Sequence, residues 1–266
     1  MDHFWVRRYG PWAVVAGAGV GLGAEFCRQI AAMGNNLVMV ALETDELADL
    51  AAELEAEHGI STIALTADLG TRKGLKEVIT ATADLDVGLL VYNAGLSATA
   101  PFLDTPLSRH LAMVDVNVRG PLTLLDAFLP AMVERQRGGV ILLSSMSSLT
   151  GTPLVSTYAA TKAFTRHLAE TLWEELAPHG IHVTAVLPPQ TDTPGYRASN
   201  PRPTKLTANA MPVGPVVAEA IGALGKRPTV IPGGANRVAG ALMERVLPRR
   251  TAVRFMGRIM RAMYED

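Results

Sequence analysis

The chain has 266 residues, a length that a single α/β domain can reach, with 48% hydrophobic and 18% charged residues. Its formal net charge of -1 gives no general attraction to nucleic acid. The single cysteine, Cys27, excludes an internal disulfide and fits a reducing compartment. No apolar run reaches the roughly 18 residues of a membrane span, and the first residues do not form a secretory signal. We therefore expect a cytoplasmic protein.

Short apolar runs alternate with helical patterns along the chain. Apolar strands that alternate with helices predict a parallel sheet covered on both faces, with right-handed crossovers between the strands. We therefore predict a single α/β domain over residues 1–266, with a doubly wound parallel sheet of about seven strands. Strands are expected at 12–16, 36–41, 61–67, 87–92, 140–144, 182–187 and 229–231, and helices at 24–33, 45–58, 107–134 (broken or kinked at Pro121) and 158–176.

A glycine-rich stretch, AGAGVGLG, lies between the first expected strand and the first expected helix. Ligands of such sheets bind beyond the carboxyl ends of the strands. Glycines let the backbone approach a pyrophosphate at a helix N-terminus, where free amides favour an anion. The position of the stretch therefore predicts a dinucleotide site formed by Gly17, Gly19, Gly21, Leu22 and Gly23.

The second expected strand is followed by Glu43. A carboxylate at this place can accept hydrogen bonds from an adenosine ribose, whereas an arginine would favour a 2'-phosphate. The alternative is an ordinary solvated charge at the start of a helix.

The stretch STYAATK places Tyr158 and Lys162 four residues apart on one expected helix. Residues i and i+4 share a helix face, so a phenol and an ammonium lie side by side. A free phenol has a pKa near ~10, and a neighbouring positive charge favours the phenolate. The pair is therefore either a proton-transfer device or a partly exposed surface pair.

Residues 10–194 resemble the short-chain dehydrogenases/reductases in the order and spacing of several motifs. The family's glycine motif is matched at Gly17, Gly21 and Gly23, and its N-N-A-G motif at Tyr92–Gly95. The helix asparagine is matched by Asn117, and the serine thirteen residues before the Y-x-x-x-K tyrosine by Ser145.

The resemblance implies a Rossmann-type fold and an oxidoreductase that interconverts a secondary alcohol and a ketone with NAD or NADP. It implies Tyr158 as general acid/base, and Lys162 as the group that holds the nicotinamide ribose and lowers the tyrosine pKa. Ser145 would bind the substrate oxygen, and Asn117 would help hold a proton-relay water. Further cofactor contacts are implied for Asp68, Leu69, Asn93, Ala94, Gly95, Pro188, Thr191 and Thr193.

Two departures from the family pattern bear on the cofactor. Pro189 stands where the family has a glycine, in the loop expected to contact the nicotinamide amide. Many family members that use NADP carry a basic residue in the glycine motif or just after the second strand, where this chain has Val20 and Leu42. NAD is therefore favoured over NADP.

Two other functions remain open on this scaffold: a non-redox epimerase or dehydratase, and a catalytically silent NAD(P)-sensing protein. The six histidines do not cluster, so no metal site is expected. The family's usual homodimer or homotetramer would use the helices at 107–134 and 158–176.

The C-terminal third matches no motif of the family. Residues 195–215 correspond to the family's substrate lid, with Tyr196 and Met211 as candidate apolar contacts or ordinary packing. Residues 237–263 hold seven arginines and one acid, Glu244, with apolar residues between them and an interruption at Pro248. This pattern is typical of a basic amphipathic tail. It would be solvated, pack at a subunit interface, or contact an anionic membrane peripherally.

Overall fold

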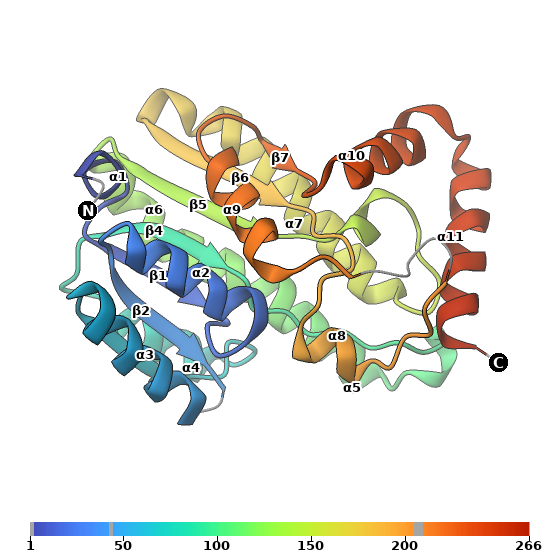
Figure 1. Cartoon of the computed structure of the whole chain (residues 1–266), viewed down its shortest axis with the longest axis horizontal. Coiled ribbons are helices and arrows are strands. Elements are labelled where there is room, and N and C mark those ends of the chain that lie inside the picture. Colours follow the sequence, from blue (N-terminus) through green and yellow to red (C-terminus); the bar gives the residue numbers. More distant parts are fainter. Residues whose placement is uncertain (1–2, 43–44, 205–209, 266) are drawn as a thin grey trace.

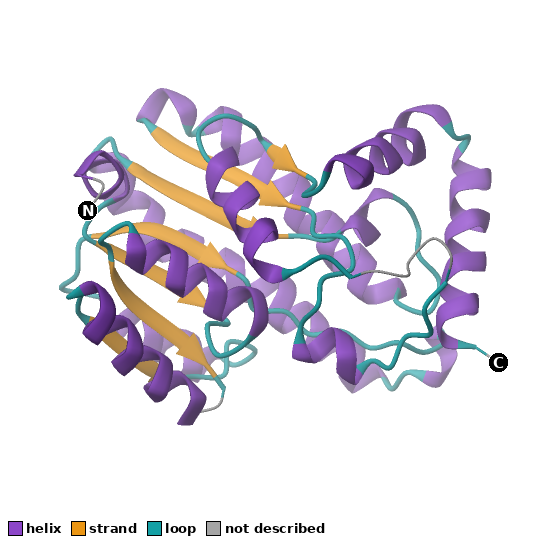
Figure 2. Ribbon diagram, in the orientation of Figure 1, coloured by secondary structure: helices purple, strands orange, loops and turns teal. Residues whose placement is uncertain are grey.

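The computed structural model describes residues 3–42, 45–204 and 210–265, so Glu43 lies outside the described residues. A seven-stranded parallel sheet, in the order β3-β2-β1-β4-β5-β6-β7, crosses the molecule (Figure 1, Figure 2). The expected Rossmann-type sheet is confirmed. Its strands are β1 Trp12–Ala16, β2 Asn36–Ala41, β3 Thr62–Thr66, β4 Val87–Tyr92, β5 Gly138–Leu143, β6 Ile181–Val186 and β7 Thr229–Val230.

Helices cover both faces of the sheet because successive strand residues point to opposite sides. Val15 of β1 packs into the core beneath α2, α3 and α9, whereas its neighbour Val14 packs into the core beneath α4, α6 and α7. Both valines are fully buried. The α-helices are α1 His3–Tyr9, α2 Gly21–Ala32, α3 Asp45–His58, α4 Arg72–Ala81, α5 Leu107–Val114, α6 Gly120–Glu134, α7 Ser156–Glu175, α8 Pro194–Ala198, α9 Val213–Ala223, α10 Gly234–Ala241 and α11 Arg249–Tyr264.

The strand order reverses at β1, which pairs with β2 on one side and β4 on the other. The connections leaving β1 and β4 therefore diverge at their carboxyl ends and leave a crevice there. The glycine-rich turn follows β1, and Asn93–Gly95 follow β4, so the sheet brings both predicted motifs to this crevice.

The single helix expected at 107–134 is two helices joined by a π-helical turn, Asp115–Arg119. Pro121, at the start of α6, has no N–H to donate to the carbonyl of Asn117 four residues earlier. The hydroxyl of Thr165 in α7 donates to that carbonyl instead, at 3.5 Å. The break expected at Pro121 is therefore present as this π-helical turn, in which the helix is wider around Asn117.

The C-terminal tail folds back onto the body of the protein. It consists of α10, a π-helical turn Leu242–Val246 and α11, which begins after Pro248 (Figure 1). Glu244, the tail's one acid, forms an ion pair of 2.6 Å with Arg166 of α7. Within the described ranges, no helix is both long enough and apolar enough to span a bilayer.

Candidate active site

The turn between β1 and α2 requires glycine at several positions. Gly17 and Gly21 have φ angles of 84° and 60°, in the left-handed region that favours glycine. A Cβ added to Gly23 would lie 1.7 Å from the carbonyl oxygen of Gly17. The helix N-cap is Val20, whose apolar side chain cannot accept the amides of the first turn. These amides, including that of Leu22, are therefore available to an anion such as a pyrophosphate.

We expected this helix to begin at Ala24, but it begins at Gly21. The three-residue difference has a functional consequence, because it places the amides of Gly21, Leu22 and Gly23 in the first helical turn. A sequence rule that treats glycines as helix breakers misses this start.

The residues that follow β4 hold the glycine turn in place by hydrogen bonds. Asn93 Nδ2 donates to the carbonyl of Gly17 at 2.7 Å, and the amide of Ala94 donates to the carbonyl of Ala16, also at 2.7 Å. We expected Asn93 to line the cofactor crevice. Its side chain holds the backbone of the glycine turn, and its contact with a cofactor stays a prediction.

The third strand ends beside the second at the same edge of the sheet. Asp68 is exposed there, and its carboxylate accepts the amide of Gly70 at 2.8 Å. Leu69 is buried. Leu42, after β2, leaves 69% of its surface exposed. These positions form the side of the crevice where the resemblance places the adenosine.

The loop after β6 reaches across to the glycine turn. Thr193 caps α8 by accepting the amide of Tyr196 at 3.2 Å. A Cβ added to Gly21 would lie 3.1 Å from the methyl group of Thr193. Thr191 is buried and its hydroxyl donates to the carbonyl of Pro189, while the carbonyl of Pro188 accepts the amide of Met146. Through Thr193, the loop predicted to contact the cofactor therefore lies against the glycine turn.

The proton-transfer pair lies on α7, as its spacing predicts. Lys162 is 4% exposed, and its ammonium donates to the carbonyl of Leu143 at 2.6 Å. It lies 5.7 Å from the centre of the Tyr158 ring. The Ser145 hydroxyl lies near enough to the Tyr158 phenol to lower the pKa of that phenol. The end of β5 and one turn of α7 thus bring the serine, tyrosine and lysine together.

Asn117 joins this group through the loop that follows β4. Its amide nitrogen donates to the carbonyl of Leu96 and to the hydroxyl of Thr161, both at 2.9 Å. Its oxygen accepts the amide of Leu96 at 2.8 Å. A Cβ added to Gly95 would lie 3.2 Å from the Lys162 nitrogen and 3.7 Å from the Asn117 oxygen. Glycine at 95 therefore leaves space between the asparagine and the lysine.

Burial controls the protonation of the pair. Burial raises the pKa of the Tyr158 phenol above its ordinary value, and the hydrogen bond from Ser145 opposes this shift. Burial also lowers the pKa of Lys162 to about 8. We expected Lys162 to lower the tyrosine pKa. The pKa is instead raised, with burial as the larger cause and Ser145 as the opposing one.

Two supporting residues were missed in the sequence. Ser144 donates to the carbonyl of Lys162 at 2.7 Å and fastens α7 to the end of β5. Thr161 donates to the carbonyl of Tyr158 at 2.7 Å and also receives Asn117. In the sequence, only their positions next to the motif residues Ser145 and Lys162 could have indicated them. Among the residues that the structure describes, no group of three or more histidine, cysteine or acidic side chains could hold a metal ion.

Comparison with known proteins gives one family. A family model described as short chain dehydrogenase matches residues 11–203. A very-long-chain 3-oxoacyl-CoA reductase of Aspergillus clavatus is 37% identical over 188 residues, which are 68% of this chain and 54% of that protein. The chain thus spans about half the length of this relative. A 7beta-hydroxysteroid dehydrogenase of Collinsella aerofaciens is 32% identical over 234 residues, 87% of this chain and 89% of that protein.

Solved structures agree. A structure described under 7beta-hydroxysteroid dehydrogenase stereoselectivity has a TM-score of 0.89 and 31% identity, covering 94% of this chain and 98% of that one. A short-chain dehydrogenase from Sphingobium yanoikuyae in complex with NADPH has a TM-score of 0.76 and 29% identity, covering 90% and 96%. With its glycine turn, its Tyr158–Lys162 pair and these matches, the chain belongs to the short-chain dehydrogenase/reductase family.

Proposed function

We propose that the protein is an NAD(P)-dependent oxidoreductase that interconverts a secondary alcohol and a ketone. The observation that carries the proposal is the contact of Ser145 with Tyr158 on the same helix turn as the buried Lys162. A hydroxyl that orients a carbonyl oxygen beside a proton donor suits this reaction. The glycine turn supplies a place for the pyrophosphate of a dinucleotide.

The nicotinamide, when bound, supplies the hydride, and the chain supplies orientation and the proton. Burial keeps the Tyr158 phenol protonated at neutral pH, so in reduction it can donate a proton to the forming alkoxide. Ser145 holds the same oxygen. Lys162, anchored on the Leu143 carbonyl, has further N–H groups to offer to a ribose hydroxyl. Asn117 holds the Gly95–Leu96 loop beside it and is our candidate for the proton-relay position.

For the cofactor we propose a preference for NAD. The two positions where a basic residue would meet a 2'-phosphate carry Val20 and Leu42, which are 45% and 69% exposed. Apolar side chains there offer nothing to a phosphate dianion. Fluorescence titration with NADH and NADPH tests this preference. Tighter binding of NADPH would contradict it and would match the relative that was solved with NADPH.

For the substrate we propose a bulky, steroid-like alcohol or ketone. The structural match to the 7beta-hydroxysteroid dehydrogenase covers 94% of the chain and so includes most of its C-terminal part. The match to the fungal 3-oxoacyl-CoA reductase covers only 68%. The sequence match to the steroid enzyme covers 87% of the chain, so this likeness extends further into the C-terminal part, where we expect the substrate to lie.

The test is NAD(P)H oxidation with oxosteroids and with 3-oxoacyl-CoA esters, in the wild type and in Tyr158→Phe. We expect turnover of an oxosteroid, lost in the variant by roughly 10²- to 10⁴-fold, with NADH affinity unchanged. Unchanged turnover in the variant would disprove the proton-donor role. Conversion of a substrate without net cofactor turnover would favour the epimerase or dehydratase. Cofactor binding without turnover would favour the NAD(P)-sensing protein.

We further propose that the protein is a homodimer or homotetramer in the cytoplasm. Apolar side chains on α5, at the start of α6 and in the middle of α7 are exposed: Leu107, Leu111, Val114, Leu122 and Phe164. Packing such a patch against a second copy would remove it from water. Light scattering should give a mass of two or four chains, and a monomer at micromolar concentration would contradict the proposal.

For the tail we propose the ordinary interpretation, in which its arginine face is solvated. Met260 and Met263 are buried against the body, while Arg250, Arg254 and Arg258 are exposed. Part of the apolar face of α11 thus packs within the chain, while Phe255 on this helix is 38% exposed. Sedimentation with anionic vesicles at physiological salt should leave the protein in solution. Co-sedimentation would support the peripheral membrane contact instead.

A further inference from the structure

Helix α7, which carries Tyr158, begins at an apolar N-cap residue. That residue is Val155, whose side chain cannot accept the amides of the first helical turn. The first hydrogen bond of the helix runs from the amide of Ala159 to the carbonyl of Val155, at 2.8 Å. Tyr158 is the third residue of this helix. Because helix ends fray, the place of the Tyr158 phenol depends on contacts that reach the first turn from outside α7.

The chain approaches α7 through a residue in an unfavourable backbone conformation. Leu154 has a φ angle of 67°, in the left-handed region where a bulky side chain is rare. Such a conformation persists only where the surrounding structure fixes it. The amide of Ala100, in the loop that follows β4, donates to the carbonyl of Leu154 at 2.8 Å. This loop therefore holds the segment that leads into α7.

His110 of α5 makes a second contact with the start of α7. Its Nδ1 lies 2.7 Å from the hydroxyl oxygen of Thr157, the residue directly before Tyr158. Its Nε2 lies 3.3 Å from the carbonyl oxygen of Phe102, in the loop that follows β4. Both His110 and Thr157 are half-buried. The imidazole thus connects this loop to the first turn of α7.

The chemistry of the two partners determines where the neutral His110 ring carries its hydrogen. A carbonyl oxygen can only accept a hydrogen bond, so Nε2 carries the hydrogen and donates to the carbonyl of Phe102. In the neutral ring the other nitrogen, Nδ1, is then an acceptor, and the Thr157 hydroxyl donates to it. Each of the three polar groups therefore has the role that its partner requires.

The Phe102 side chain also supports the imidazole of His110. The centres of the two rings are 4.5 Å apart and their planes differ by 29°, which is a stacked arrangement. The same loop is fixed near its start by Asn117, whose side chain both donates to and accepts from the backbone of Leu96. The loop, α5 and the start of α7 are thus joined by hydrogen bonds and ring contacts beside Tyr158.

We propose that His110 is a positioning residue, which fixes the first turn of α7 through the Thr157 hydroxyl and thereby sets the place of the Tyr158 phenol. His110 acts through Thr157 and takes no part in the proton transfer itself. The inference rests on the proposed function, because the place of this phenol matters for turnover only if Tyr158 is the proton donor. A displacement of about 1 Å at a positioned group costs about 100-fold in rate, so the effect is large enough to measure.

The experiment removes the hydrogen bond from either side. Thr157→Val deletes the hydroxyl and keeps a β-branched side chain, whereas Thr157→Ser keeps the hydroxyl. His110→Ala deletes the acceptor. His167→Ala is the matched control, since His167 is a histidine of α7 with an exposed side chain. Steady-state kinetics with NADH and the best ketone gives kcat and KM, and mass spectrometry measures hydrogen exchange of peptides that contain the amide of Ala159.

We expect Thr157→Val and His110→Ala each to lower kcat by about 10- to 100-fold, with KM and NADH affinity as in the wild type. The double variant should lose no more than His110→Ala alone, because both changes remove the same hydrogen bond. Hydrogen exchange at the start of α7 should become faster in the same variants. Thr157→Ser should restore both kcat and slow exchange, and His167→Ala should match the wild type.

A wild-type kcat in Thr157→Val would overturn the positioning role and leave the proposed activity standing. An equal loss of kcat in Thr157→Ser would also overturn it, because the hydroxyl would then be irrelevant. Hydrogen exchange separates the two proposals if the wild type reduces no ketone. Faster exchange in Thr157→Val, but not in Thr157→Ser, would then support the placement of this turn by His110 and contradict the proposed activity. Unchanged exchange would contradict both.

Discussion

Replacing Gly23 with alanine should weaken cofactor binding by about 100-fold or more without unfolding the chain. The new Cβ would lie 1.7 Å from the carbonyl oxygen of Gly17, whereas a carbon and an oxygen that are not bonded stay about 3.3 Å apart or more. The turn must therefore move by roughly 1.5 Å. Displacements of about 1 Å at positioned groups cost about 100-fold, so we expect NADH affinity to fall by that factor or more.

Gly222→Ala is the matched control, since this helical glycine has no atom within 4 Å of the added Cβ. It should bind NADH as the wild type does and melt at the same or a slightly higher temperature. The assay is NADH fluorescence titration, with thermal melting to confirm that both variants are folded. Overpacking should cost the Gly23→Ala variant about 1–3 kcal/mol of folding free energy. Wild-type NADH affinity in a folded Gly23→Ala variant would refute the close-packing argument.

Three further predictions concern other parts of the molecule. Ser145→Ala should lower kcat by about 10²- to 10³-fold with little effect on KM, as measured with the best ketone, because it removes one donor to the reacting oxygen. Burial and Arg8 lower the pKa of His182 below its ordinary 6.5, so below that pH the unfolded chain binds the proton more readily. Melting temperature should therefore be constant between about pH 6.5 and 7.5 and fall below that range, with a shallower fall in His182→Gln. Glu244→Gln weakens the ion pair to Arg166 and should lower the melting temperature by about 2–4 °C in a calorimetric scan, with no change expected in a Glu265→Gln control.

The sheet and the catalytic group could be predicted because they depend on local patterns. Buried parallel strands are apolar throughout, and β1, β2 and β4 begin and end at the expected residues. Tyr158 and Lys162 meet because four residues make one helical turn. Pro121 likewise marked the break in the long helix, although a π-helical turn cannot be read from residue type.

The remaining features depend on contacts between distant segments. Helix α1 was not expected. Tyr9 and Arg8 fix it to His182, more than 170 residues away, by hydrogen bonds of 2.8 Å each. The arginine pattern of the tail left open a solvated face, a subunit interface and a membrane contact, and the contact of Met263 with Gln190 gave no signal in the sequence. The raised pKa of Tyr158 also follows from tertiary burial, which the Y-x-x-x-K spacing does not report.

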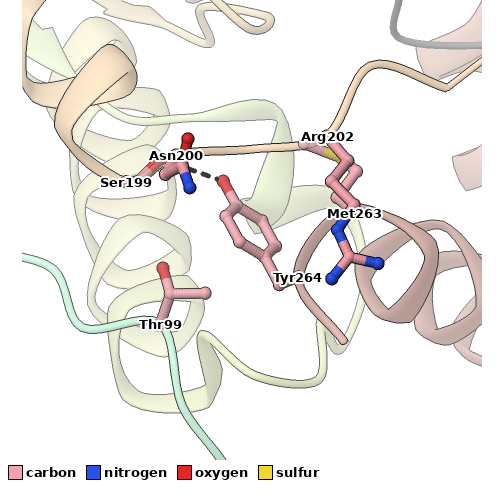
Figure 3. Close-up of a pocket in the computed structure, with 6 residues that line it drawn as sticks. All are labelled: Thr99, Ser199, Asn200, Arg202, Met263 and Tyr264. Carbon is pink, nitrogen blue, oxygen red and sulfur yellow. Dashed lines mark hydrogen bonds between the residues drawn. The ribbon is translucent and has the colours of Figure 1, made fainter. Parts of the chain in front are cut away.

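Helix α11 is attached to the predicted lid by a hydrogen bond of 3.0 Å from the amide of Arg202 to the carbonyl of Met263. The residues proposed for proton transfer lie within 11–203, the part that the family model matches. Met263 and Tyr264 of α11, in contrast, line a cavity together with Ser199 and Asn200 (Figure 3). A substitution in the last turn of α11 can change the shape of that cavity while Ser145 and Tyr158 keep their geometry. Libraries of variants at Met263 and Tyr264 would therefore change the cavity and leave Ser145 and Tyr158 as they are. The last turn of α11 is thus the place to begin a redesign of ligand binding.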